Sequence, residues 1–166
     1  MAMIEPCLSF KEDAYCGLYC GACELLVATR EGTLDALAEQ RDMPPEDLTC
    51  YGCKTARSSI YCQTCAIKQC ARARQVEFCV ECADYPCERL RAFQGDGKPH
   101  KAVLQKNLAA INAQGVEAWL AAQQRRWNCP ACGVRFAYYA RSCRNGHAPV
   151  YNCEDEARDE QARGSR

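Results

Sequence analysis

The chain has 166 residues, equal numbers of acidic and basic side chains, and 16 cysteines. A chain of this length forms one domain of ordinary size or two small ones, which excludes a large catalytic barrel. A cysteine content close to one residue in ten is typical of either a disulfide framework or a set of metal sites.

The N-terminal sequence MAMIEPCLSFKED has no basic stretch followed by an apolar run, so no export signal is predicted. The longest apolar runs are also shorter than the roughly 20 residues that span a membrane. We therefore expect a soluble, cytoplasmic protein without a membrane partner. Because cellular reductants keep unbound thiols reduced in the cytoplasm, closely paired cysteines are predicted to be metal ligands rather than disulfides.

The charges are unevenly distributed along the chain. Residues 1–97 carry 10 basic and 15 acidic side chains, residues 98–153 carry 8 and 1, and residues 154–166 carry 3 and 5, which gives −5, +7 and −2. The motifs described below suggest four parts: a cysteine-rich multi-zinc module at 1–97, a helical hairpin packing on it at 98–127, a zinc-ribbon-like module at 128–153 and a charged flexible tail at 154–166.

The first motif in chain order is YCGLYCGACELL, which places Cys16, Cys20 and Cys23 at the spacing C-x3-C-x2-C. Radical S-adenosylmethionine enzymes use this spacing to hold a catalytic iron–sulfur cluster. Those enzymes place an aromatic residue before the third cysteine, where this chain has Ala22, and they follow the motif with about 200 residues of barrel. We therefore interpret the motif as a zinc anchor at the start of a helix.

Two short helices are predicted next, over residues 24–32 and 33–43. Thr33 is placed to cap the second helix, and Leu34, Leu37 and Ala38 share one of its faces. Two prolines directly after the second segment end it.

The densest thiols lie between residues 50 and 87 and include an internal repeat. YCQTCAIKQC at 61–70 and FCVECADYPC at 78–87 both read aromatic-C-x2-C-x4-C. The C-x2-C half suits a metal knuckle, a tight turn that directs two sulfur atoms at one ion, and the third cysteine closes the site. A helix is predicted to begin at Pro86, followed by a loop at 95–98.

Residues 100–127 contain no cysteine and are predicted to form a helical hairpin that supplies much of the core. Gly115 separates two apolar stripes at helical spacing. Their members are Val103, Leu104, Leu108, Ile111, Val116, Trp119 and Leu120.

The segment after the hairpin is predicted to be a zinc ribbon. Its C-P-x-C-G motif is a ribbon knuckle, and VRFAYYA and APVYNC have the β-branched and aromatic content of short strands. Cys129, Cys132 and Cys143 need a fourth ligand, for which the C-x3-H spacing favours His147 over Cys153. The predicted fold is a small metal-stabilised α+β protein, with short helices around several cysteine-rich zinc sites and a C-terminal β ribbon.

We predict three to four Zn2+ ions per chain. Cys7 or His100 would bring the eleven cysteines between residues 16 and 87 to twelve ligands, enough for three sites, but spacing does not say which cysteines share a site. An iron–sulfur cluster is the alternative cofactor, although the bacterial ferredoxin spacing is absent from the sequence. The predicted ligands are Cys16, Cys20, Cys23, Cys50, Cys53, Cys62, Cys65, Cys70, Cys79, Cys82, Cys87, Cys129, Cys132, Cys143 and His147.

Several motifs follow one another in the order CGLYCGAC, CYGC, CQTCAIKQCA, CVECADYPCERL and WLAAQQRRWNCPACG. In this order they resemble an uncharacterised prokaryotic family, domain of unknown function thirty-seven ninety-five, over residues 16–133. The resemblance implies one metal-rich, zinc-binding module at 16–87 with the ribbon as a usual appendage, and it implies no reaction. The chain departs from the family at CRNGH, where a second C-x2-C-G knuckle is expected.

The sequence leaves three classes of function open. Closed four-ligand zinc sites stabilise a fold and leave no position for a substrate, which favours an adaptor that binds a protein partner. The basic segment at 98–153, with arginines near aromatic residues, predicts nucleic-acid binding as the alternative. The second alternative is a redox protein or enzyme, with Cys7 and Cys153 as candidate reactive thiols. No catalytic residue is predicted, because the sequence contains no recognisable acid–base, phosphate-loop or hydrolase motif.

Overall fold

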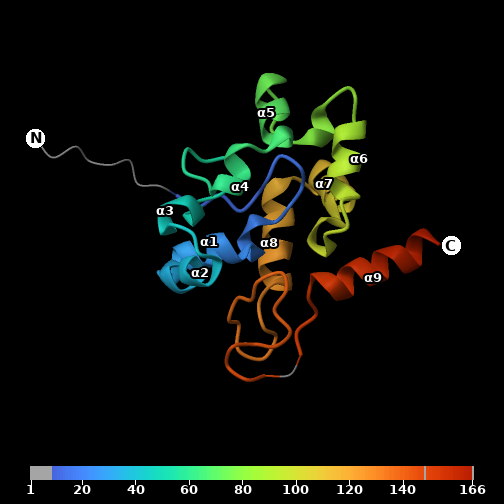
Figure 1. Cartoon of the computed structure of the whole chain (residues 1–166). Helices are drawn as coiled ribbons and strands as arrows, with labels where there is room; N and C mark the ends of the chain where they lie inside the picture. The colour runs from blue at the N-terminus through green and yellow to red at the C-terminus, as the bar shows by residue number, and fades with distance from the viewer. Residues whose placement is uncertain (1–8, 148, 166) are drawn as a thin grey trace, which may run out of the picture.

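The computed structural model describes residues 9–147 and 149–165, which form short helices joined by turns (Figure 1). No helix in these two ranges is both long enough and apolar enough to cross a membrane. The elements in chain order are η1 (Cys20–Ala22), α1 (Glu24–Glu31), α2 (Leu34–Arg41), α3 (Pro45–Leu48), α4 (Ile60–Gln63), α5 (Ala66–Ala73), η2 (Cys79–Glu81), α6 (Glu88–Gln94), η3 (Pro99–Lys101), α7 (Leu104–Gln114), α8 (Val116–Arg126) and α9 (Cys153–Gly164), where η denotes a 3-10 helix.

The two helices predicted after the opening motif are confirmed as α1 and α2. Gly32 ends α1 in the left-handed region at φ 69°, where a glycine is favoured. Thr33 occupies the N-cap position of α2, but its side chain makes no capping hydrogen bond. Asp42, at φ 51°, ends α2, and Pro45 begins α3. The two prolines that follow α2 therefore also form the start of α3, with Pro44 as its N-cap residue and Pro45 as its first residue.

The predicted helical hairpin is also confirmed, as α7 and α8. Gly115 joins them at φ 85° and ψ 157°. The side chains of Leu104 and Leu108 on α7 are fully buried, and Trp119 on α8 is 1% exposed. The Trp119 ring meets Tyr19 edge-on, with 6.1 Å between the ring centroids. This hairpin therefore forms the centre against which the opening motif packs.

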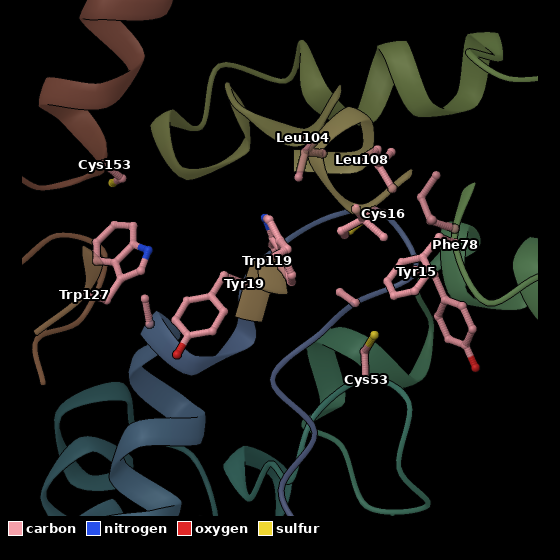
Figure 2. Packing of buried hydrophobic residues seen from close by; sticks show 14 of the residues in the cluster. Tyr15, Cys16, Tyr19, Cys53, Phe78, Leu104, Leu108, Trp119, Trp127 and Cys153 are labelled. Carbon is pink, nitrogen blue, oxygen red and sulfur yellow. The ribbon is translucent and has the colours of Figure 1, made fainter. Parts of the chain in front are cut away.

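The main hydrophobic core includes cysteines as well as aromatic and aliphatic side chains. Figure 2 shows Cys16 and Cys53 in the same cluster as Tyr15, Phe78 and Leu108. The cluster takes buried residues from Ala14 to Cys153, so it joins segments that are distant in the sequence. A smaller second cluster lies under α1, α2 and α3 and consists of Leu25, Ala38, Leu48 and Cys50.

The opening loop lies close to α7 at Gly17. This residue has φ 86°, and a Cβ atom on it would lie 2.8 Å from the carbonyl oxygen of Leu104 and 2.9 Å from Cγ of Leu108. The buried Asn107 amide donates to the Gly17 carbonyl oxygen at 2.9 Å. Both the backbone conformation and the packing distance therefore require a glycine at this position.

The predicted β zinc ribbon, and with it the α+β class, is wrong. No strand forms in the described residues, and extended pairing between α8 and α9 is limited to the isolated bridges Asn128–Arg135 and Ser142–Pro149. A backbone group that could extend the pairing beyond these bridges binds to another part of the chain. The Tyr138 N–H donates to the Ala22 carbonyl at 2.9 Å. The residues with strand-like composition pack against the helical body instead of forming a sheet of their own.

The segment expected to be a flexible tail forms the helix α9. Asn152 caps it, since its side-chain oxygen accepts hydrogen bonds from the N–H groups of Glu154 and Asp155. The Asp155 carboxylate accepts in return from the Asn152 N–H at 3.0 Å, which completes a capping box. The charged composition suggested a frayed end, but this cap and an ion pair between Lys106 and Glu160 at 2.8 Å hold the helix in place.

Candidate metal centre

Four side chains from two turns between α8 and α9 converge: Cys129, Cys132, Cys143 and His147. Their ligand atoms all lie within 4.8 Å of one another. The sulfur atoms of Cys132 and Cys143 are 3.5 Å apart, and Cys129 Sγ is 3.7 Å from His147 Nδ1. Tetrahedral zinc with Zn–S bonds of about 2.3 Å places its ligand atoms roughly 3.8 Å apart. This group therefore has the donor atoms and the spacing to hold a metal ion.

The first turn is a tight reversal that directs two cysteines to the same side. The Gly133 N–H donates to the Cys129 carbonyl at 2.7 Å, and the Cys129 N–H donates to the Val134 carbonyl at 2.8 Å. Gly133 adopts φ 71°, a conformation that residues other than glycine adopt only with strain. A backbone hydrogen bond from Val134 lowers the pKa of the Cys132 thiol. The backbone of this turn therefore favours a thiolate before any metal is considered.

The second turn supplies Cys143 and His147 and repeats the same design. The Gly146 N–H donates to the Cys143 carbonyl at 2.9 Å, and Gly146 has φ 77°. Asn145 contributes two donors, with its backbone nitrogen 3.4 Å from Cys143 Sγ and its side-chain amide 3.5 Å from Cys132 Sγ. Sequence reasoning missed Asn145. The N-G dipeptide, a frequent turn signal, could have identified it.

The two turns belong to a longer stretch, residues 128–150, which we call the knuckle segment. Figure 1 shows its loops below α8, at one end of the molecule. Aromatic side chains join it to the helical body, since the buried Trp127 ring lies 5.5 Å from Phe136 and 5.1 Å from Tyr138. The Tyr138 hydroxyl donates to the carbonyl oxygen of Tyr19 in the opening motif. The candidate centre is thus connected to the N-terminal part of the chain.

Glu12 is the main polar link between the knuckle segment and the rest of the protein. Its carboxylate oxygens lie 2.6 Å from Arg30 Nη1 and 2.6 Å from Arg135 Nη1. The Tyr19 hydroxyl and the Gln124 amide also donate to it, at 2.8 and 3.2 Å. The residue is only 8% exposed, so these partners replace water around a buried charge. Nothing in the sequence pattern around Glu12 distinguished it from other surface acids.

Two opposing effects act on the pKa of Glu12. Burial raises the pKa, because it disfavours the charged carboxylate. Hydrogen bonds from Arg135, Tyr19, Arg30 and Gln124 together outweigh burial and lower the pKa to about 2, from an ordinary value of 4.5. The native protein therefore holds this carboxylate in its ionised form, with its charge balanced by the two arginines.

The basic segment at 98–153 uses many of its cations within the molecule. Arg144 forms a bidentate pair with Glu31 of α1, at 2.6 and 3.0 Å. The nearly buried Lys101 lies 2.5 Å from Asp96. Further pairs are Arg135 with Glu12, Lys106 with Glu160, Arg126 with Glu156 and Arg141 with Glu154. Nucleic-acid binding through this segment stays a prediction, and the cations named in these pairs already have acidic partners.

The predicted ligands of the N-terminal region lie close to one another but are less tightly grouped. In the described residues, only the knuckle group brings three or more possible ligand atoms within 4.8 Å. Cys16 is buried, and its pKa is raised by burial and by the neighbouring thiolates of Cys53, Cys65 and Cys79. Burial also raises the pKa of Cys62 to about 12, with Cys50, Cys53 and Cys23 as charged neighbours. These sulfur atoms share an apolar core rather than one compact site.

Cys20 and Cys53 are neighbours that shift each other's pKa. A hydrogen bond from the Cys20 thiol lowers the pKa of Cys53 to about 7 and raises that of Cys20. Lys68 and Lys54 also favour the Cys53 thiolate, and Lys54 is ion-paired with Asp13 at 2.8 Å. The third group of predicted ligands, Cys70, Cys79, Cys82 and Cys87, lines one small cavity.

The alternative ligands have other surroundings. His100 lies 2.6 Å from the Tyr139 hydroxyl and stacks on Tyr138 at 5.1 Å between centroids. Burial lowers the pKa of His100 to about 4. Cys153 is buried at the first turn of α9, outside the knuckle group that contains His147. Cys7 lies outside the described residues.

Comparison with known proteins assigns the first half of the chain. Residues 12–92 match the family described as protein of unknown function (DUF3795). The comparisons with curated proteins and with solved structures found no match. The family match includes every cysteine from Cys16 to Cys87 and ends before the hairpin and the knuckle segment, so it is shorter than the resemblance expected over residues 16–133. We refer to residues 12–92, the part of the chain that matches this family model, as the DUF3795 domain.

Proposed function

We propose that the protein binds zinc at Cys129, Cys132, Cys143 and His147, and that the ion has a structural role. The observation that carries this proposal is the convergence of four ligand atoms within 4.8 Å from two glycine-ended turns. Thiolate and imidazole ligands in a tetrahedral arrangement are typical of zinc. The ion would join two turns that have no sheet between them, which gives it a direct part in holding the knuckle segment.

Four protein ligands complete the tetrahedral coordination of zinc, so this site is closed. A catalytic zinc site keeps one position for water or substrate, and this arrangement has none once all four ligands bind. We therefore infer that the protein acts through its surface, as an adaptor that binds a protein partner. The internal ion pairs of the basic segment favour a protein over nucleic acid, because binding phosphates would require breaking them.

The test is substitution of the metal by Co2+, whose visible spectrum reports the number and type of ligands. The full chain should bind Co2+ tetrahedrally at the knuckle, and added imidazole should leave that spectrum unchanged because no position is open. His147→Ala should show an altered spectrum that added imidazole restores. Cys153→Ala is the matched control and should behave like the unmodified chain.

Two outcomes would contradict the proposal. If imidazole changes the spectrum of the unmodified chain, the site is open and an enzymatic role becomes the better interpretation. If His147→Ala has the same spectrum as the unmodified chain, His147 is not a ligand.

Nucleic-acid binding has its own test. Single-stranded RNA and DNA at low salt should give no mobility shift with the full chain if its cations stay paired internally. A shift that weakens steeply with added salt would instead favour the nucleic-acid alternative.

A further inference from the structure

A second group of four cysteines surrounds a small cavity between α5, η2 and α6. The cavity has a volume of about 30 Å³ and is lined by Cys70, Cys79, Cys82 and Cys87. The remaining lining includes the apolar residues Ile67, Ala71, Val76 and Leu90, and two arginines, Arg74 and Arg89. Four cysteines are therefore the only residues of this lining that commonly bind metal ions.

Local structure fixes where each of these cysteines lies. Cys70 belongs to α5, Cys79 begins η2, Cys82 is its C-cap residue and Cys87 is the N-cap residue of α6. The Cys82 N–H donates to the Cys79 carbonyl at 3.2 Å, which closes a C-x2-C turn. The Cys79 N–H donates to the Tyr15 carbonyl at 2.8 Å and ties this turn to the opening motif. The group thus combines one knuckle with two helix positions.

The charges around this cavity leave room for a bound cation. Two arginines, Arg74 and Arg89, belong to the lining. Arg74 donates to Cys82 Sγ at 3.2 Å and is also paired with Asp84 at 2.6 Å. Two guanidinium groups, one of them shared with a carboxylate, cannot balance four thiolates. A divalent ion within the cavity could do so.

We propose that Cys70, Cys79, Cys82 and Cys87 bind one Zn2+ ion in a four-thiolate site within the DUF3795 domain. The small cavity volume of about 30 Å³ favours a single ion over a four-iron cluster, which has eight core atoms. This site is independent of the knuckle site and shares no residue with it.

The two sites should differ in affinity. Among the described residues, no three sulfur atoms of the second site lie within 4.8 Å of one another, so binding has to draw them inward toward the roughly 3.8 Å spacing of tetrahedral zinc. That contraction requires α5 or α6 to move, which reduces the net free energy of binding. We therefore expect the DUF3795 site to be the weaker one and to lose its ion first when a chelator is added.

The test uses 113Cd2+ bound to the full chain, because the cadmium chemical shift separates a four-thiolate site from a site with three thiolates and one imidazole. The unmodified chain should give one resonance of each kind. The double variant Cys79→Ser, Cys82→Ser should lose only the four-thiolate resonance, and Cys132→Ser should lose or shift only the other. Cys153→Ala, a buried cysteine in neither group, is the control and should keep both.

The possible results test the four-thiolate site separately from the knuckle site. A spectrum of the unmodified chain without a four-thiolate resonance overturns this inference even if the variants fail to fold, and leaves the knuckle proposal intact. A four-thiolate resonance that persists in the Cys79→Ser, Cys82→Ser variant also overturns it, since the thiolates then come from other cysteines. Protein purified without oxygen could also contain iron and labile sulfide that the Cys79→Ser, Cys82→Ser variant lacks. That result would overturn the inference, because an iron–sulfur cluster rather than a zinc ion would occupy the site.

Discussion

The knuckle segment and the DUF3795 domain are both rich in cysteine, but they differ in how closely they group their thiols. In the knuckle segment, two turns, each closed by one isolated bridge, hold four ligand atoms within 4.8 Å. In the described part of the DUF3795 domain, no three possible ligand atoms come that close, although Cys16 and Cys53 lie in the same hydrophobic core as Cys129 and Cys143. The comparison shows that burial in a shared core does not by itself bring thiols to the spacing of metal ligands.

This difference predicts different responses to metal loss. A closed metal site stabilises the turns that supply its ligands, so loss of the ion should loosen the knuckle segment more than the DUF3795 domain. The predictions below separate the two regions or test the contacts that join them.

The largest effect is expected from removing the knuckle ligands. In Cys132→Ser, Cys143→Ser, hydrogen exchange at the amides of Phe136 and Val150 should speed up by about a thousandfold or more, because zinc binding contributes on the order of 10 kcal/mol in small zinc modules. Amides of the opening motif, such as that of Cys20, should change by less than about tenfold. Equal acceleration in both regions would show that they unfold together and would remove the distinction between them.

The next effect concerns the buried contact between the regions. Glu12 has a pKa of about 2 in the folded protein against an ordinary 4.5, so its contribution to stability is complete above pH 4.5 and is lost as the pH falls toward 2. Glu12→Gln should lower the free energy of unfolding by about 3 kcal/mol at pH 7 but by only about 1 kcal/mol at pH 3. Urea unfolding at the two pH values measures this. A difference that does not depend on pH would mean that the carboxylate charge is not what stabilises the contact.

A smaller effect tests the packing of the opening motif against α7. Gly17→Ala should lower the free energy of unfolding by about 2 kcal/mol, because the residue has a positive φ and its new methyl group would meet the backbone of α7. Gly97→Ala is the matched control, since Gly97 has φ 85° with no atom within 4 Å of a Cβ, and it should cost about 1 kcal/mol. Equal losses in denaturant unfolding would show that conformation alone, and not the close approach to Leu104, requires Gly17.

The smallest effect is expected at the exposed contact between the regions. Glu31 and Arg144 form a bidentate pair, but the Arg144 side chain is 58% exposed. Exposed ion pairs contribute little, so Glu31→Gln should change the free energy of unfolding by less than about 1 kcal/mol. Thermal unfolding in low and high salt measures it. A loss as large as that of Glu12→Gln would show that the surface pair, rather than the buried one, joins the two regions.

Part of this fold could be predicted from the sequence. Apolar spacing and glycine positions identified α1, α2 and the hairpin of α7 and α8, because these signals lie within each helix or at its ends. The prediction of strands was wrong. VRFAYYA has the composition of a strand, but its backbone binds to a distant segment through the hydrogen bond from the Tyr138 N–H to the Ala22 carbonyl. Local composition does not contain that information.

The candidate site shows the same limit. The C-x2-C and C-x3-H spacings identified the knuckle residues, because each pair lies within one turn. The polar network around Glu12 was not predictable, since its partners Gln124 and Arg135 are 112 and 123 residues away. The grouping of Cys70 with Cys79, Cys82 and Cys87 likewise required the packing of α5 against η2 and α6.

The most direct test of the central claim is the metal content of protein purified without oxygen, compared between the unmodified chain and Cys132→Ser, Cys143→Ser. We expect zinc in the unmodified chain, no visible absorption, and one zinc ion fewer per chain in the variant. The same zinc content in both proteins, or iron with labile sulfide that the variant loses, would contradict a structural zinc ion at Cys129, Cys132, Cys143 and His147.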